Sequence, residues 1–136
     1  MSLTRWFLDS LARSHSERGD LRLRISNRTR KVELAHCVEV ADTGATRRRG
    51  LLGRKTLPSG EGLWIAPCEA VHTCGMQFPI DLIYLDRSRC VKKLRHAVPP
   101  WRLSACLSAH SVLELAAGSI RKTQTNPGDI LEFSSG

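Results

Sequence analysis

After its first twenty residues the chain alternates apolar and polar positions. Leu21, Leu23 and Ile25 alternate with arginines, and a second alternating run, Val32 to Val40, follows a polar turn at residues 27–30. A period of two places every second side chain on one face, as in a half-buried strand. The pattern predicts a β-hairpin at the start of the domain.

Short apolar runs separated by Gly, Pro and Asn continue this pattern toward the C-terminus. They span Gly62–Ala66, Ala70–Thr73, Asp81–Leu85, Cys90–Val98, Ser111–Leu115 and Ile130–Phe133. Residues 43–55 instead predict a short helix, weakened by two glycines and capped by Thr43 or Thr46. Together these elements predict a mainly β fold (β-rich α+β), a small barrel-like or sandwich domain with one or two short helices.

The first twenty residues have a different pattern. Their apolar residues have helical spacing and are Leu3, Trp6, Phe7, Leu8 and Leu11. A polar stretch, residues 14–20, follows. We therefore expect an N-terminal amphipathic helix and linker over 1–20 and a single β-rich barrel-like domain over 21–136. Residues 3–12 either pack back on the barrel or contact a protein partner or a membrane surface.

Length and composition narrow the class of protein. A chain of 136 residues accommodates one domain, and it has no apolar stretch of the roughly 20 residues that span a bilayer. Its N-terminus lacks the apolar core of a signal peptide, and its five cysteines are an odd number. These features predict a cytoplasmic protein with reduced thiols, or one peripheral to the inner membrane. The sequence does not specify an oligomeric state.

The formal net charge of +8 is concentrated in residues 1–55, which carry 13 basic and 6 acidic residues. Weak nucleic-acid binding through phosphate contacts is therefore one alternative function. Specific readout is not expected, because this half has only Trp6 and Phe7 as aromatic side chains and contains no nucleic-acid-binding motif.

Several ordered motifs resemble one family. They are Arg49-Gly-Leu-Leu-Gly-Arg54, Gly62-Leu-Trp-Ile-Ala-Pro67, Val71-His-Thr-Cys-Gly-Met-Gln-Phe-Pro-Ile-Asp-Leu-Ile-Tyr-Leu-Asp86, Val112-Leu-Glu-Leu-Ala-Ala-Gly118 and Pro127-Gly-Asp129. Over residues 32–133 the chain resembles the prokaryotic family called domain of unknown function 192. The resemblance implies a compact, β-rich, barrel-like domain and implies no activity. Many members of that family begin with an export signal or lipid anchor, whereas this sequence opens with the Trp-Phe-Leu segment.

Arginines and a polar strand segment supply the predicted binding site. We expect a groove for a small anionic ligand or a partner segment, formed by Arg49, Gly50, His72, Met76 and Asp81. If Thr46 caps the helix, free N–H groups and the arginines lie near one terminus, an arrangement that holds anions.

Each of these features also has a purely structural interpretation. The arginines form a solvated face, with Arg49 paired to Asp81 or Asp42. Met76 fills the core, and Asp81 accepts hydrogen bonds from turn backbone.

Metal and enzyme chemistry are the remaining alternatives. Two Cys-x3-His pairs, Cys68 with His72 and Cys106 with His110, offer a Cys2His2 set, but this spacing is not a recognised zinc signature. Cys74 beside His72 is the one candidate nucleophile of a hydrolase, and no known catalytic motif is present. The sequence favours a binding module over an enzyme, with no cofactor and no metal.

Overall fold

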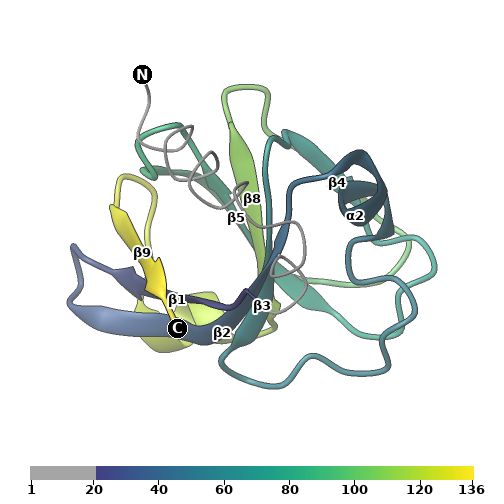
Figure 1. Ribbon diagram of the computed structural model, residues 1–136, viewed down its shortest axis with the longest axis horizontal. Coiled ribbons are helices and arrows are strands. Elements are labelled where there is room, and N and C mark those ends of the chain that lie inside the picture. Colours follow the sequence, from purple (N-terminus) through teal and green to yellow (C-terminus); the bar gives the residue numbers. More distant parts are fainter. Residues whose placement is uncertain (1–20) are drawn as a thin grey trace.

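The structure, a computed structural model, describes residues 21–136 (Figure 1). The predicted N-terminal helix lies outside these residues. In chain order the elements are β1 (Leu23–Asn27), β2 (Val32–Ala41), α2 (Gly44–Arg49), β3 (Glu61–Ile65), β4 (Ala70–His72), β5 (Ile80–Leu85), β6 (Val91–Val98), β7 (Leu103–Ala105), β8 (Ser111–Ala116), α3 (Ser119–Thr123) and β9 (Leu131–Ser135). The mainly β class with two short helices is confirmed for the described residues.

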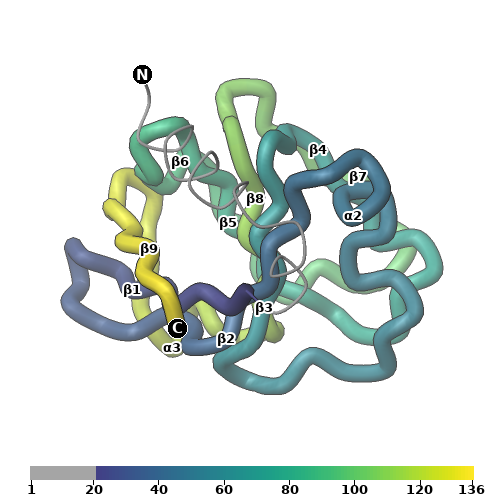
Figure 2. The backbone as a smooth tube through the Cα atoms, in the orientation of Figure 1, coloured from purple at the N-terminus to yellow at the C-terminus, as the bar shows by residue number. Residues whose placement is uncertain are grey.

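Seven strands form one curled sheet in the order β6-β5-β8-β3-β2-β1-β9. Neighbouring strands are antiparallel except β2 and β3, which run parallel. The two edges meet at one end, where Cys90 bridges Ile130 and the Val91 N–H donates to the Asp129 carbonyl at 2.8 Å. The sheet is therefore a half-barrel, and the tube in Figure 2 shows β9 curling toward the segment that carries β6.

The strands β3, β5 and β8 are buried on both faces, and their side chains divide between two apolar clusters. Trp64, Ile83 and Leu113 belong to the cluster enclosed by the curl, which we call the inner core. Their chain neighbours Ile65 and Leu82 belong to a second cluster on the other face, which we call the outer core. This division follows from the period of two along a strand.

A lobe made of α2, the two-stranded β4–β7 sheet and their loops covers the outer core, on the right in Figure 1. The lobe is tied to the half-barrel by the buried Tyr84 hydroxyl, which lies 2.8 Å from the Ser104 hydroxyl of β7. The predicted hairpin of β1 and β2 is confirmed. The predicted helix is shorter than expected, because it ends at Gly50, whose φ is +50°.

Two elements were absent from the sequence prediction, β7 and α3. Each is short, and α3 begins where the Asp81 carboxylate accepts a hydrogen bond from the Ile120 N–H, a contact from another strand. None of the helices in residues 21–136 has the length and hydropathy of a membrane-spanning segment.

Candidate functional site

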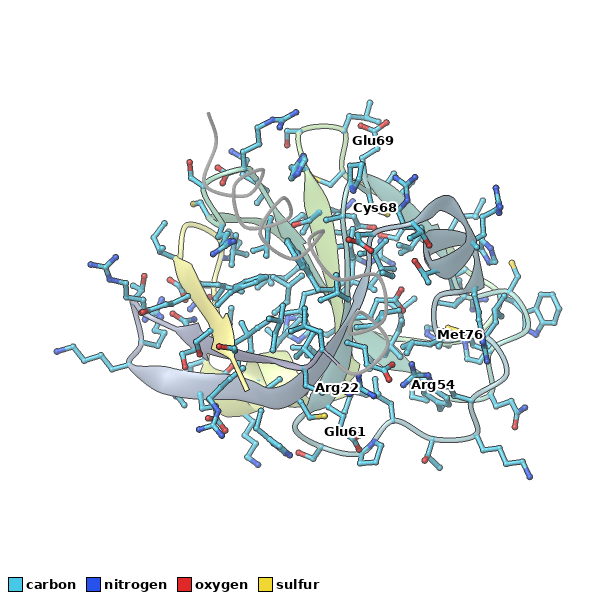
Figure 3. The ribbon with its side chains drawn as sticks, in the orientation of Figure 1. Arg22, Arg54, Glu61, Cys68, Glu69 and Met76 are labelled. Carbon is cyan, nitrogen blue, oxygen red and sulfur yellow. The ribbon has the colours of Figure 1, made fainter. Side chains whose placement is uncertain are left out.

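A cavity of about 540 Å³ lies where the lobe meets the outer face of the sheet. Figure 3 labels two of its lining residues, Cys68 and Met76, on the side of the molecule that carries α2. The apolar part of the lining comprises Leu51, Leu52, Ile65, Pro67, Ala70, Val71 and Met76. The polar part comes from the arginines of α2, from Cys68 and His72, and from Glu114.

Glu114 is a buried carboxylate that lines this cavity. On β8 it lies between Leu63 of β3 and Leu82 of β5, on the outer face, and only 5% of the residue is exposed. Within residues 21–136 no hydrogen bond or ion pair reaches its carboxylate. Burial raises the pKa of Glu114 to about 7, against the smaller opposing effect of Arg54. A carboxylate held in this way is unusual in a folded interior.

Gly50 keeps the space beside Glu114 open. A Cβ atom at position 50 would lie 3.8 Å from Glu114 Oε1, and the φ of +50° disfavours any other residue there. The backbone turn that ends α2 thus leaves one carboxylate oxygen without a covering side chain.

The three arginines of α2 line the cavity and differ in their partners. Arg47 donates from Nη1 to the Pro67 carbonyl at 3.1 Å and from Nε to the Thr43 carbonyl at 3.3 Å. Arg48 and Arg49 are exposed, and in the described part of the chain neither pairs with a carboxylate. Two guanidinium groups without an ion-pair partner among residues 21–136 therefore border the cavity.

Of the two predicted capping residues, Thr43 and not Thr46 begins α2. Thr43 is the N-cap, and its hydroxyl accepts the Thr46 N–H at 3.1 Å within a capping box. The arginines consequently lie in the last turn of α2, at the opposite end from the N–H groups. Arginine side chains alone, without helix N–H groups, supply the positive charge of the cavity.

A second cavity lies on the other side of Arg49, lined by Glu39, Arg22 and Arg54. Arg22 and Arg54, which are labelled close together in Figure 3, both pair with Glu39. Glu39 thus already holds two of the arginines that line this second cavity.

Four of the five predicted ligand-binding residues, Arg49, Gly50, His72 and Met76, line the first cavity. His72 is exposed, and its Nδ1 accepts the Cys74 N–H at 3.3 Å. Met76 is buried in the outer core, so its thioether both fills the core and borders the cavity.

Asp81, the fifth residue, lies elsewhere. Its carboxylate is fully buried and accepts the Ala97 N–H at 2.8 Å and the Ile120 N–H at 2.9 Å. On β5 it shares the inner face with Ile83, so the sheet separates it from Arg49. The predicted pairing of Arg49 with Asp81 or Asp42 is not formed among the described residues.

The segments that carry the two Cys-x3-His pairs are joined by backbone hydrogen bonds, and their side chains do not form a set of metal ligands. The Cys68 N–H donates to the His110 carbonyl, and the Cys106 N–H donates to the Glu69 carbonyl, both at 2.8 Å. Residues 21–136 contain no group of three or more Cys, His, Asp or Glu side chains placed to hold a metal ion.

Among the described residues, no histidine is hydrogen-bonded to the thiol of Cys68 or Cys74. The Cys68 thiol donates to the Ala70 carbonyl at 3.1 Å, and burial raises its pKa, which favours the protonated thiol over the nucleophilic thiolate. Cys74 contacts His72 through its backbone N–H and does not line the cavity.

A family model for the DUF192 family, described as "Uncharacterized ACR", matches residues 25–133. The chain belongs to the DUF192 family. The resemblance carried by the sequence motifs is therefore confirmed. No curated protein sequence matches the chain significantly.

Two crystal structures share the fold of this DUF192 domain. One, from Sinorhizobium meliloti and described as a "putative transcription regulator", has a TM-score of 0.73 and 22% identity, over 83% of this chain and 92% of its own. The other, a protein of unknown function from Novosphingobium aromaticivorans, has a TM-score of 0.69 and 22% identity, over 82% of this chain and 83% of its own. At this identity the similarity shows the fold alone.

Sequence reasoning did not single out Glu114 as a site residue of the DUF192 domain. The available signal was an acidic residue inside the otherwise apolar strand Val112-Leu-Glu-Leu-Ala116. A buried strand rarely carries a charged residue without a partner, so such a residue marks either a structural pair or a site.

Proposed function

We propose that this DUF192 domain is a binding module whose cavity beside α2 takes a small organic anion. The observation that carries the proposal is the pair Arg48 and Arg49, which borders the apolar cavity and has no carboxylate partner in the described chain. Guanidinium groups bind carboxylates and phosphates through two parallel N–H donors. The apolar walls would hold the organic part of the ligand.

The size of the cavity supports a small molecule. Pockets for small ligands have volumes of roughly 300–1,000 Å³, with apolar walls and few polar groups. The volume here, about 540 Å³, lies in that range.

Nucleic-acid binding has less support than anion binding. Three of the basic residues expected to contact phosphates pair with acidic residues of the same domain: Arg22 with Glu39, Arg24 with Glu33 and Arg30 with Asp129. These pairs reduce the positive field that phosphate binding needs.

Isothermal titration calorimetry of the full chain tests the proposal. The probes are butanoate, hexanoate, 4-methylpentanoate and inorganic phosphate, with the double variant Arg48→Gln/Arg49→Gln beside the wild type. We expect a carboxylate to bind the wild type, and the double variant to bind it at least about tenfold more weakly, because each lost charge-assisted bond contributes about 1.5–3 kcal/mol.

The matched control is the double variant Arg28→Gln/Lys31→Gln, which removes the same two positive charges from the exposed turn between β1 and β2. The control should bind like the wild type. Equal weakening in the control and in the double variant would mean that net charge attracts the anions, and would contradict a site in the cavity. The absence of binding to the wild type by any probe would contradict the proposal as a whole.

A further inference from the structure

Glu114 gives the cavity a second kind of polar group. The arginines of α2 form one polar part of the lining, and Glu114, a residue 5% exposed between Leu63 and Leu82, forms another. The cavity is therefore lined both by positive charge and by an acid. A ligand that satisfies both parts needs two different polar groups.

Nothing in residues 21–136 donates a hydrogen bond to this carboxylate. Asp81, by contrast, is fully buried and is satisfied by two backbone N–H donors. Since a buried carboxylate without a donor destabilises the folded state, a donor from the ligand would gain more binding energy here than at an exposed acid.

We infer that the ligand is a small zwitterion, with an ammonium group on Glu114 and an anionic group on Arg48 and Arg49. This inference rests on the proposed function, because the arginines must hold the anionic group. An ammonium group supplies both three N–H donors and the opposite charge, whereas a hydroxyl supplies one neutral donor. Gly50 leaves Glu114 Oε1 accessible to such a group.

The inference also predicts how pH acts on binding. The charged or titratable groups that line the cavity with Glu114 are Arg47, Arg48 and Arg49 of α2 together with Cys68 and His72, and the charge of Arg54 also acts on Glu114. An ammonium group needs Glu114 ionised, and a pKa of about 7 means that lowering the pH from 8 to 6 protonates it. The advantage of a zwitterion over a plain carboxylate should therefore shrink at pH 6.

The experiment compares matched pairs of probes by calorimetry on the full chain at pH 8. The pairs are 4-aminobutanoate with butanoate, 6-aminohexanoate with hexanoate, and leucine with 4-methylpentanoate. They vary the spacing of the two charges. We expect at least one zwitterion to bind about tenfold more tightly than its carboxylate, the effect of one added charge-assisted contact. This advantage should disappear in Glu114→Gln and persist in the exposed control Glu132→Gln.

The outcomes separate the two proposals. If carboxylates bind through Arg48 and Arg49 but no zwitterion gains more than about twofold, the inference fails and the anion-binding function stands. If a zwitterion keeps its full advantage in Glu114→Gln, its ammonium group does not contact this residue and the inference fails. If hexylamine binds and no carboxylate does, the anion-binding proposal fails. Thermal melting of Glu114→Gln confirms that the variant is folded.

Discussion

Asp81 and Glu114 are buried carboxylates on neighbouring strands, β5 and β8, and they lie on opposite faces of one sheet. The register pairs Asp81 with Leu115 and Glu114 with Leu82, so the two acids are only one residue apart along the ladder. On the inner face Asp81 accepts hydrogen bonds from Ala97 and Ile120, and on the outer face Glu114 accepts none within the described chain. Both acids are buried, but only Asp81 has hydrogen-bond donors within the described chain. We propose that the inner acid organises the fold and that the outer acid binds a ligand.

The largest effect on stability is expected from Asp81→Ala. The substitution leaves the buried Ile120 N–H and the partly buried Ala97 N–H without an acceptor, and hydrogen bonds to charged groups contribute about 1.5–3 kcal/mol each. We therefore expect the free energy of unfolding to fall by about 4 kcal/mol. Urea denaturation followed by tryptophan fluorescence measures it.

Asp86→Ala is the matched control for this change. Asp86 also accepts two backbone bonds, from Ser88 and Cys90, but in an exposed turn. We expect a loss of about 1 kcal/mol, because water replaces the lost bonds there. Equal losses of unfolding free energy in the two variants would show that burial of Asp81 does not increase its contribution to stability.

Glu114→Gln is expected to raise the free energy of unfolding, whereas Asp81→Ala lowers it. Burial raises the folded-state pKa of Glu114 from 4.5 to about 7, so between these values the folded protein binds more protons than the unfolded chain. Stability therefore falls as the pH rises through this window, and the full cost is present above pH 7. Glutamine removes that cost. The variant should be more stable than the wild type by about 3 kcal/mol at pH 8 and equally stable near pH 4.

Thermal and urea unfolding of both proteins from pH 4 to pH 8 check this prediction. A variant that is less stable than the wild type at pH 8 would mean that the Glu114 carboxylate has a donor in solution. The comparison with Asp81 would then fail, because both acids would be structural.

The smallest effect on stability is expected from Tyr84→Phe. The change removes the bond between the Tyr84 and Ser104 hydroxyls, which joins the half-barrel to β7 of the lobe. We expect a loss of about 1 kcal/mol, the net contribution of one neutral hydrogen bond. Hydrogen exchange should show the loss in the lobe more than in the inner core. Equal acceleration in both regions would mean that they open as one unit.

The strands could be predicted from the sequence because each has a local pattern. The alternation of Leu23 and Ile25 with arginines and the run at 81–85 correspond to β1 and β5. The parallel pairing of β2 with β3 has no such local signal, since it depends on how the lobe crosses the sheet. The strand β7 is three residues long, which is too short to show the alternation of apolar and polar residues that marks a strand.

The site was predictable only in part, for a related reason. Arg49, Gly50, His72 and Met76 lie in segments that fold against each other, and the cavity brings them together. Asp81 was expected beside them because it follows Met76 closely in the chain. The face that a strand residue occupies depends on the register with its neighbours, and a shift of one residue reverses it. Glu114 comes from a strand distant in sequence, so only the packed sheet places it in the cavity.

The meeting of the two sheet edges at Cys90 and Ile130 also bears on how copies of this chain behave at high concentration. An open edge strand offers free N–H and C=O groups to a second molecule, which is a common route to aggregation. Here one end of both edges is already hydrogen-bonded within the chain. Along the rest of β6 the exposed Lys92 and Arg95 add charge that disfavours a further strand. The curl that encloses the inner core thus also protects this end of the sheet from intermolecular strand pairing.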